Sequence, residues 1–160
     1  MNSKTFAEIL DEAFEQSCRM DASLNERLQA FADTVRKLNP TFAEAVDRLV
    51  VRLQETGAGM AAPAPGDVMP NFLLPDDTGH LVSLEELLQN GPVALAFHRG
   101  HWCPYCRINT NALVEAQSIA QAEGAQIAAI LPEGRQFASE LRAEAKAPFP
   151  ILFDLSLIHI

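Results

Sequence analysis

The residues with the clearest chemistry lie in one short stretch, AFHRGHWCPYCR, from Ala96 to Arg107. Cys103 and Cys106 are three residues apart and stand where an apolar run gives way to a helical pattern. A thiolate at a helix N-terminus is stabilised by unpaired backbone N–H groups and by the helix dipole, so its pKa falls and it becomes a nucleophile. We therefore expect Cys103 to be the reactive thiol. Cys106, one turn further along, is placed to form a redox-active disulfide with it.

The residues around the two cysteines favour the same chemistry. From residue 61 onward the chain has only five Lys or Arg against eleven Asp or Glu, yet positive or titratable groups gather at the motif. They are His98, Arg99, His101 and Arg107. Pro104 suits the first turn of a helix because its missing N–H has no partner there anyway. We predict supporting roles for Arg99, His101, Trp102, Pro104 and Arg107, although Arg107 could equally be an ordinary exposed helix residue and His98 a buried core residue.

A metal site is the first alternative for a CxxC pair. Structural zinc needs about four ligands, usually from a second CxxC or a Cys/His pair. The chain has no second CxxC, and a strand that runs into a helix turns His98 and His101 to different sides. We therefore predict no metal at this site and no cofactor.

The first 57 residues show only helical patterns. Three capping boxes are expected to open three helices, formed by Thr5 with Glu8, Ser23 with Glu26, and Thr41 with Glu44. Apolar residues recur at helical spacing after each of them, and Gly57 ends the third helix. These stripes are packing faces, so residues 1–57 should form a helical hairpin or small bundle.

The rest of the chain alternates short strands with helices. The Gly-, Ala- and Pro-rich residues 58–66 are predicted to be a linker, and residues 67–160 a second domain of α/β class. The pattern predicts a hairpin of 72–74 with 80–82, a short helix 84–88 capped by Ser83, and a buried central strand at 93–98. A helix at 104–123, a strand at 126–131, a helix at 134–145 and a strand at 150–154 follow.

Composition and charge restrict the kinds of partner that the chain is expected to bind. The chain has 160 residues, 48% of them hydrophobic, which is enough to bury a core. Twelve basic against 21 acidic residues give a net charge of −9, which disfavours binding to nucleic acid or to an anionic membrane surface. No apolar run approaches the length of a membrane span, and the N-terminus lacks a signal-peptide pattern. We predict a cytoplasmic protein.

The order of these features resembles a known family. GDVMPNFLLPDDTGHLVSL, then a buried strand, then WCPYC, then an αβ unit ending in FPILFD, is similar to the AhpC/TSA branch of the thioredoxin superfamily. Peroxiredoxin-like proteins with an RGxWCPYC motif resemble it most. The resemblance covers about residues 66–154 and implies a thioredoxin-like fold, which would extend beyond Asp154 by further elements, so the C-terminal part of the fold is expected to be missing from this chain.

The resemblance implies a thiol peroxidase. Cys103 would be the peroxidatic cysteine, oxidised by H2O2 or an organic hydroperoxide to a sulfenic acid. Cys106 would resolve it as a disulfide, and thioredoxin or a similar dithiol would reduce that disulfide. The family pattern has Pro seven residues and Thr or Ser three residues before the peroxidatic cysteine, whereas this chain has Ala96 and Gly100. Arg99 or His101 would then supply the hydrogen bond and charge that these positions lack.

Two other functions remain open. A thioredoxin- or glutaredoxin-like oxidoreductase would use the same cysteine pair on disulfides, although glutaredoxins carry CPYC near the chain start and without an upstream hairpin. A non-catalytic protein would use the CxxC as a redox sensor and the N-terminal helices to dimerise. The helices would dock either on the second domain or on another subunit, so a homodimer is among the expected assemblies. Cys18 is expected to be a buried or half-buried helix residue.

Overall fold

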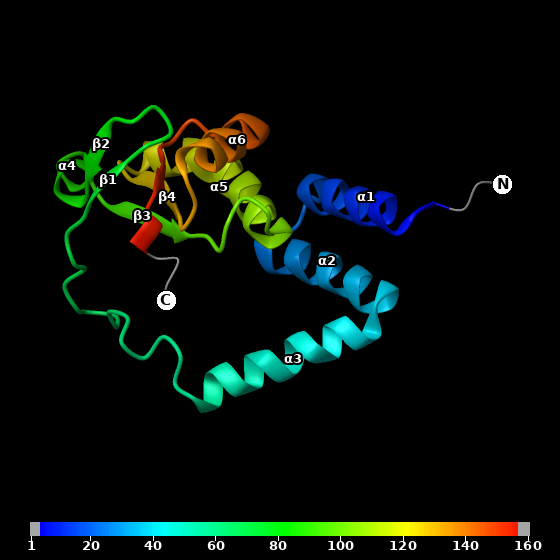
Figure 1. Cartoon of the computed structure of the whole chain (residues 1–160). Coiled ribbons are helices and arrows are strands. Elements are labelled where there is room, and N and C mark those ends of the chain that lie inside the picture. Colours follow the sequence, from blue (N-terminus) through cyan, green and yellow to red (C-terminus); the bar gives the residue numbers. More distant parts are fainter. Residues whose placement is uncertain (1–3, 157–160) are drawn as a thin grey trace. The chain divides into compact units, whose positions relative to one another are not determined.

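The computed structural model describes residues 4–156 and divides the chain between Pro70 and Asn71. The first unit is helical and the second mixes helices with strands (Figure 1). The expected α/β fold preceded by a helical segment is therefore confirmed. The predicted linker at 58–66 stays a prediction.

The N-terminal unit contains α1 (Phe6–Arg19), α2 (Leu24–Leu38) and α3 (Pro40–Glu55). The first two capping boxes form as expected. The side chains of Thr5 and Ser23 accept hydrogen bonds from the N–H groups of Glu8 and Glu26, and each glutamate reaches back to the N–H of its cap. Satisfying these otherwise unpaired donors sets where both helices begin.

The third predicted capping box is wrong. Asn39, not Thr41, is the N-cap of α3, and its side chain accepts a hydrogen bond from the N–H of Phe42. Pro40 takes the first helical position, where its fixed φ and its missing N–H favour a helix start. An Asn-Pro pair thus outcompetes a Thr cap two residues later. At the other end, Gly57 adopts a φ of +68° just past the helix, as its predicted stop role requires.

The two possible caps of α3 can be separated by mutation. We expect Asn39→Ala to lower the free energy of unfolding of the helical unit by about 1 kcal/mol, because a helix donor loses its partner. Thr41→Ala should change it by a few tenths of that value at most. Denaturant unfolding followed by circular dichroism measures both free energies. A larger loss of stability for Thr41→Ala than for Asn39→Ala would identify Thr41 as the N-cap instead.

The second unit has five strands and three helices within the described residues. The strands are β1 (Leu73–Pro75), β2 (Leu81–Ser83), β3 (Val93–Phe97), β4 (Gln126–Leu131) and β5 (Ile151–Phe153). The helices are α4 (Leu84–Leu88), α5 (Pro104–Ala122) and α6 (Arg135–Ala145). Strands β1 and β2 form the expected antiparallel hairpin, each one residue later than predicted. Strands β3, β4 and β5 form a parallel sheet in that order.

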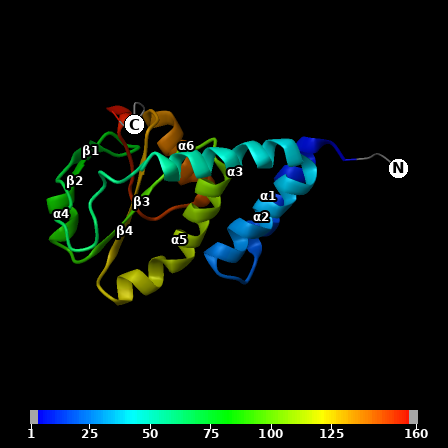
Figure 2. The same ribbon diagram turned by 90° about the horizontal axis from the view of Figure 1, so that it is seen from below.

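The alternating side chains of β4 connect two hydrophobic layers. Ile127, Ala129 and Leu131 face one layer with α6 and with Leu113 and Val114 of α5. Ala128 and Ile130 face the other layer, with Val82 of β2 and Leu87 of α4. Figure 2 shows α5 and α6 on one side of the sheet and the hairpin with α4 on the other. Because both faces of β4 are packed against other elements, its sequence is a nearly continuous apolar run.

The prediction that residues 93–98 form the buried central strand needs correction. Among the described residues β4 is the middle strand and β3 lies at the edge, with Phe97 58% exposed. An apolar run shows that a strand packs against other elements, but it carries no information on strand order. The parallel pairing of β3 with β4 still brings the carboxyl ends of both strands to one edge, and the CxxC stretch begins there.

Candidate redox site

A tight loop carries the chain from β3 into α5. The N–H of His98 donates to the carbonyl of Ile130 at 2.9 Å, which continues the pairing of β3 with β4 for one residue. The chain then turns at Gly100, whose φ of +148° favours glycine, and the N–H of Cys103 closes the turn on the carbonyl of Gly100 at 3.2 Å. Cys103 is the N-cap of α5 and Pro104 its first residue. The predicted position of the CxxC at a helix start is therefore confirmed.

Both cysteines are reduced and buried. Cys103 is 0% exposed and Cys106 8% exposed. The guanidinium Nη2 of Arg99 donates to the Sγ of Cys103 at 3.1 Å, and the backbone N–H of Arg99 donates to the Sγ of Cys106 at 3.2 Å. One loop residue thus directs a donor at each sulfur.

The contacts of the two sulfurs, with each other and with Arg99, give the two thiols very different pKa values. The pKa of Cys103 falls to about 5, chiefly because the Cys106 thiol donates a hydrogen bond to it, with smaller contributions from the N–H of Cys106 and the charge of Arg99, and against the opposing effect of burial. The same hydrogen bond, together with burial, raises the pKa of Cys106. The pair is therefore a thiolate beside a thiol.

Aromatic rings hold Arg99 in place. Its guanidinium carbon lies 5.9 Å from the centroid of the Trp102 ring and 5.7 Å from that of Tyr105, both within cation–π range. Trp102 is 66% exposed, so this side of the site faces solvent. The positive charge is thereby kept over the buried sulfur instead of extending into water.

His98 lies deeper, under α5. It is 5% exposed, its Nδ1 is 3.5 Å from the hydroxyl of Thr110, and its Nε2 has no hydrogen-bond partner within residues 4–156. The Thr110 hydroxyl donates to the carbonyl of Cys106 at 3.0 Å. Burial lowers the pKa of His98 to about 4, so this side chain is neutral at pH 7.

His98 is expected to make the protein acid-labile. An unfolded chain binds a proton at His98 below its ordinary pKa of 6.5, whereas the folded chain binds it only near 4, so stability falls as pH drops through this window. The lowered pKa corresponds to about 3 kcal/mol, an order-of-magnitude figure. His98→Asn should flatten the curve of unfolding free energy against pH relative to wild type, and the exposed His80→Asn should not. Parallel curves for wild type and His98→Asn would contradict this.

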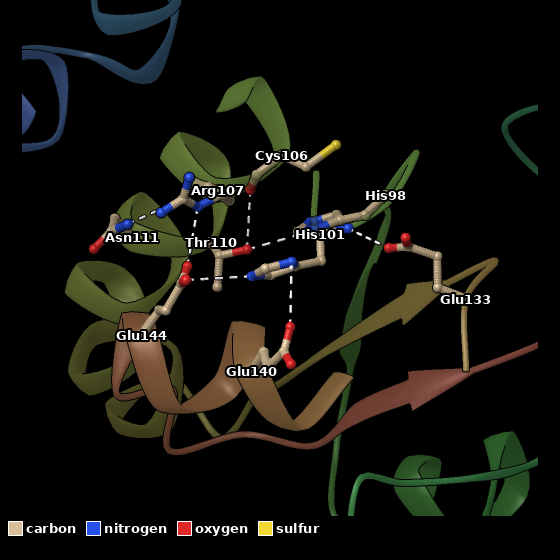
Figure 3. A network of polar contacts seen from close by, with 9 residues as sticks. All are labelled: His98, His101, Cys106, Arg107, Thr110, Asn111, Glu133, Glu140 and Glu144. Carbon is tan, nitrogen blue, oxygen red and sulfur yellow. Dashed lines mark hydrogen bonds and ion pairs between the residues drawn. The ribbon is translucent and has the colours of Figure 1, made fainter. Parts of the chain in front are cut away.

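The contacts of His101 and Arg107 lead toward α6 (Figure 3). The His101 ring lies between two glutamates, with Nδ1 3.7 Å from Glu140 and Nε2 3.3 Å from Glu144, and it stacks on Phe137. The Nε of Arg107 donates to Glu144 at 3.0 Å. Of the predicted supporting residues, Arg99 contacts both cysteine sulfurs, Trp102 contacts Arg99, and Pro104 begins α5 directly after Cys103. His101 and Arg107 contact α6 instead.

Sequence reasoning missed the acidic residues that reach this loop from other elements. Glu133 follows β4, and its carboxylate accepts a hydrogen bond from the backbone N–H of His101. Glu140 and Glu144 come from α6. A single glutamate after a strand has no local signature. The topology does provide a signal, because the ends of two adjacent parallel strands meet at one edge, which places residues after β4 next to residues after β3.

Three further observations concern the whole described chain. Cys18 lies half-buried in α1, as expected. Within residues 4–156, no group of three or more His, Cys, Asp or Glu side chains is arranged to hold a metal ion. No helix in the same range has the length and apolar character needed to cross a membrane.

A parallel sheet between two layers, with a CxxC at the junction of a strand and a helix, defines a thioredoxin-like redox protein. The comparisons agree with this class. Residues 65–157 match the model of the AhpC/TSA family, and the chain belongs to that family. A search of curated proteins found no match.

Solved structures support the same fold. Peroxidoxin BcpB from Mycobacterium tuberculosis is 26% identical, with a TM-score of 0.55 over 56% of this chain and 58% of that one. The thioredoxin domain of a thiol-disulfide oxidoreductase from Bacteroides vulgatus is 22% identical, with a TM-score of 0.51 over 57% of this chain and 65% of that one. This chain therefore spans less than two thirds of either protein.

Proposed function

We propose that this protein is a thiol peroxidase in which Cys103 attacks H2O2 or an organic hydroperoxide. The observation that carries the proposal is the contact of the Arg99 guanidinium with the buried Cys103 sulfur. The 26% identity to a protein named a peroxidoxin supports the same proposal.

The chemistry follows from the paired thiolate and thiol. The Cys103 thiolate attacks the terminal oxygen of HO–OR, so an S–O bond forms while the O–O bond breaks. Sulfur is oxidised to the sulfenic acid, and the departing alkoxide or hydroxide takes a proton from solvent. Arg99, already within hydrogen-bond distance of the sulfur, would stabilise the negative charge that moves onto the peroxide oxygens.

Resolution and recycling then need no further residue. The Cys106 thiol condenses with the sulfenic acid, giving the Cys103–Cys106 disulfide and water. A dithiol reductant such as thioredoxin returns both cysteines to thiols and leaves as its own disulfide. A cytoplasmic location, where such reductants keep thiols reduced, fits this cycle.

The low pKa of Cys103 sets the reaction rate that a true peroxidase must exceed. At pH 7 a thiol with a pKa near 5 is about 99% ionised, against about 1% for one near 9, so acidity alone gives roughly a hundredfold gain in thiolate. A peroxidase must exceed that gain, because positioned donors also activate the peroxide.

Stopped-flow fluorescence of Trp102 on mixing reduced protein with H2O2 is the direct measurement. A rate constant far more than a hundredfold above that of free cysteine supports a peroxidase. A rate within that factor, together with fast reduction of a model disulfide, supports instead the thiol-disulfide oxidoreductase that the same thiolate–thiol pair could serve.

A further inference from the structure

The geometry of the redox site depends on the four-residue loop from Arg99 to Trp102. This loop directs the guanidinium of Arg99 at Cys103 and the N–H of Arg99 at Cys106. The loop has no regular secondary structure of its own. One end is fixed by the hydrogen bond from the N–H of His98 to the carbonyl of Ile130 in β4, and the other by the turn that the N–H of Cys103 closes. A loop that holds two donors to hydrogen-bond distance needs a further anchor between those ends.

Glu133 is placed to be that anchor. Its Oε2 accepts the hydrogen bond from the N–H of His101, in the middle of the loop (Figure 3). The same oxygen also fills the space beside Gly100, because a Cβ built at residue 100 would lie only 2.8 Å from it and closer still to the indole nitrogen of Trp102. Glu133 therefore contacts the loop both through a hydrogen bond and by packing.

The charge of Glu133 cannot be its contribution to the thiolate. A carboxylate near a thiolate disfavours ionisation, because like charges repel. The other carboxylates at this end of the site contact side chains and not the loop backbone. Glu140 and Glu144 face the His101 ring, and Glu144 also binds Arg107. What separates Glu133 from them is its contact with the main chain of the loop.

We propose that Glu133 is a positioning residue of the redox site, whose carboxylate holds the Arg99–Trp102 loop so that Arg99 can direct its two donors at the cysteine sulfurs. Glu133 acts through the loop and does not touch the reacting sulfur. The inference rests on the proposed role of Cys103 as the nucleophile, and it applies equally to a peroxidase and to a disulfide oxidoreductase.

Positioning and simple electrostatics predict shifts of opposite sign. If Glu133 positions the loop, Glu133→Ala raises the pKa of Cys103 by about one unit, because the donors drift from the sulfurs. If only its charge matters, Glu133→Ala and Glu133→Gln both lower that pKa. Glu133→Gln keeps an oxygen that can accept from the His101 N–H, so under the proposal it restores a pKa at or slightly below that of wild type.

The experiment is a pH titration of thiolate ultraviolet absorbance in the full-length reduced protein, with Cys103→Ser subtracted to assign the signal. Glu140→Ala is the matched control, because it removes a carboxylate from the same cluster without touching the loop backbone, and it should not raise the pKa. A rise for Glu133→Ala with recovery in Glu133→Gln supports the proposal. An unchanged or lowered pKa in Glu133→Ala overturns it.

Two further measurements keep the outcome decisive. If Glu133→Ala does not fold, Glu133→Asp provides the test, since it keeps the charge but draws the carboxylate back from the N–H of His101. A raised pKa then supports the proposal and an unchanged one overturns it. If the wild-type protein shows no acidic thiol at Cys103, the proposed role of Cys103 as the nucleophile is wrong. If Cys103 is acidic but its pKa does not change when Glu133 is replaced, only the positioning role of Glu133 is wrong.

Discussion

Replacing Cys103 with serine is expected to abolish peroxide reduction, whereas replacing Cys106 with serine should leave the first turnover intact. Serine at 103 removes the thiolate that performs the attack, and loss of a nucleophile costs about a thousandfold or more in rate. Serine at 106 keeps an O–H that can donate to the Cys103 sulfur, so the largest cause of the low Cys103 pKa is preserved. The sulfenic acid then has no adjacent thiol to condense with.

Two measurements separate the variants. Stopped-flow fluorescence should show a fast first phase in wild type and Cys106→Ser and none in Cys103→Ser. Mass spectrometry after one equivalent of H2O2 should find one added oxygen in Cys106→Ser and a loss of two hydrogens in wild type. Turnover in Cys106→Ser at the wild-type steady-state rate would contradict the assigned resolving role, because a dithiol that reduces the sulfenic acid directly bypasses an adjacent thiol only at a lower rate. Cys18→Ser in that background would then show whether Cys18 replaces it.

The regular elements nearest the site could be predicted from the sequence because their signals are local. The strand at β4 matches its prediction residue for residue, and the starts of α5 and α6 differ from theirs by one residue or less. Pro104 at the first helical position and the Gly134 cap fix these starts. The cap of α3 was misassigned because two adjacent signals competed and only the Asn-Pro pair fits the turn after α2.

Only the part of the site that lies on one continuous segment of the chain could be predicted from the sequence. The residues from Arg99 to Cys106 lie on one loop and one helix start, so their proximity is a local fact. The partners of His101 and Arg107 come from α6, and the anchor Glu133 follows β4. Those contacts depend on how the sheet is ordered and how α6 packs on it. Periodicity gives no information on either, which is also why β3 was expected at the centre of the sheet.

Replacing Arg99 with methionine should move the pH dependence of the peroxide reaction. In wild type the second-order rate constant should be half-maximal near pH 5, the pKa of Cys103, and level above pH 6. Without the guanidinium the midpoint should rise by about one to two units, since an adjacent opposite charge lowers a pKa by about that much. At pH 6 the rate would then fall about twofold to tenfold from lost thiolate alone.

The plateau at high pH separates the two roles of Arg99. If Arg99 only lowers the Cys103 pKa, the Arg99→Met and wild-type rates converge above pH 8, where Cys103 is ionised in both proteins. If Arg99 also stabilises the charge that develops on the peroxide oxygens, the variant remains slower there by a further tenfold or more, as expected for a lost transition-state donor. Arg107→Met is the matched control, because it removes a cation of the same helix start that pairs with Glu144. An equal shift in both variants would mean that the total positive charge, and not the Arg99 contact, sets the reactivity of Cys103.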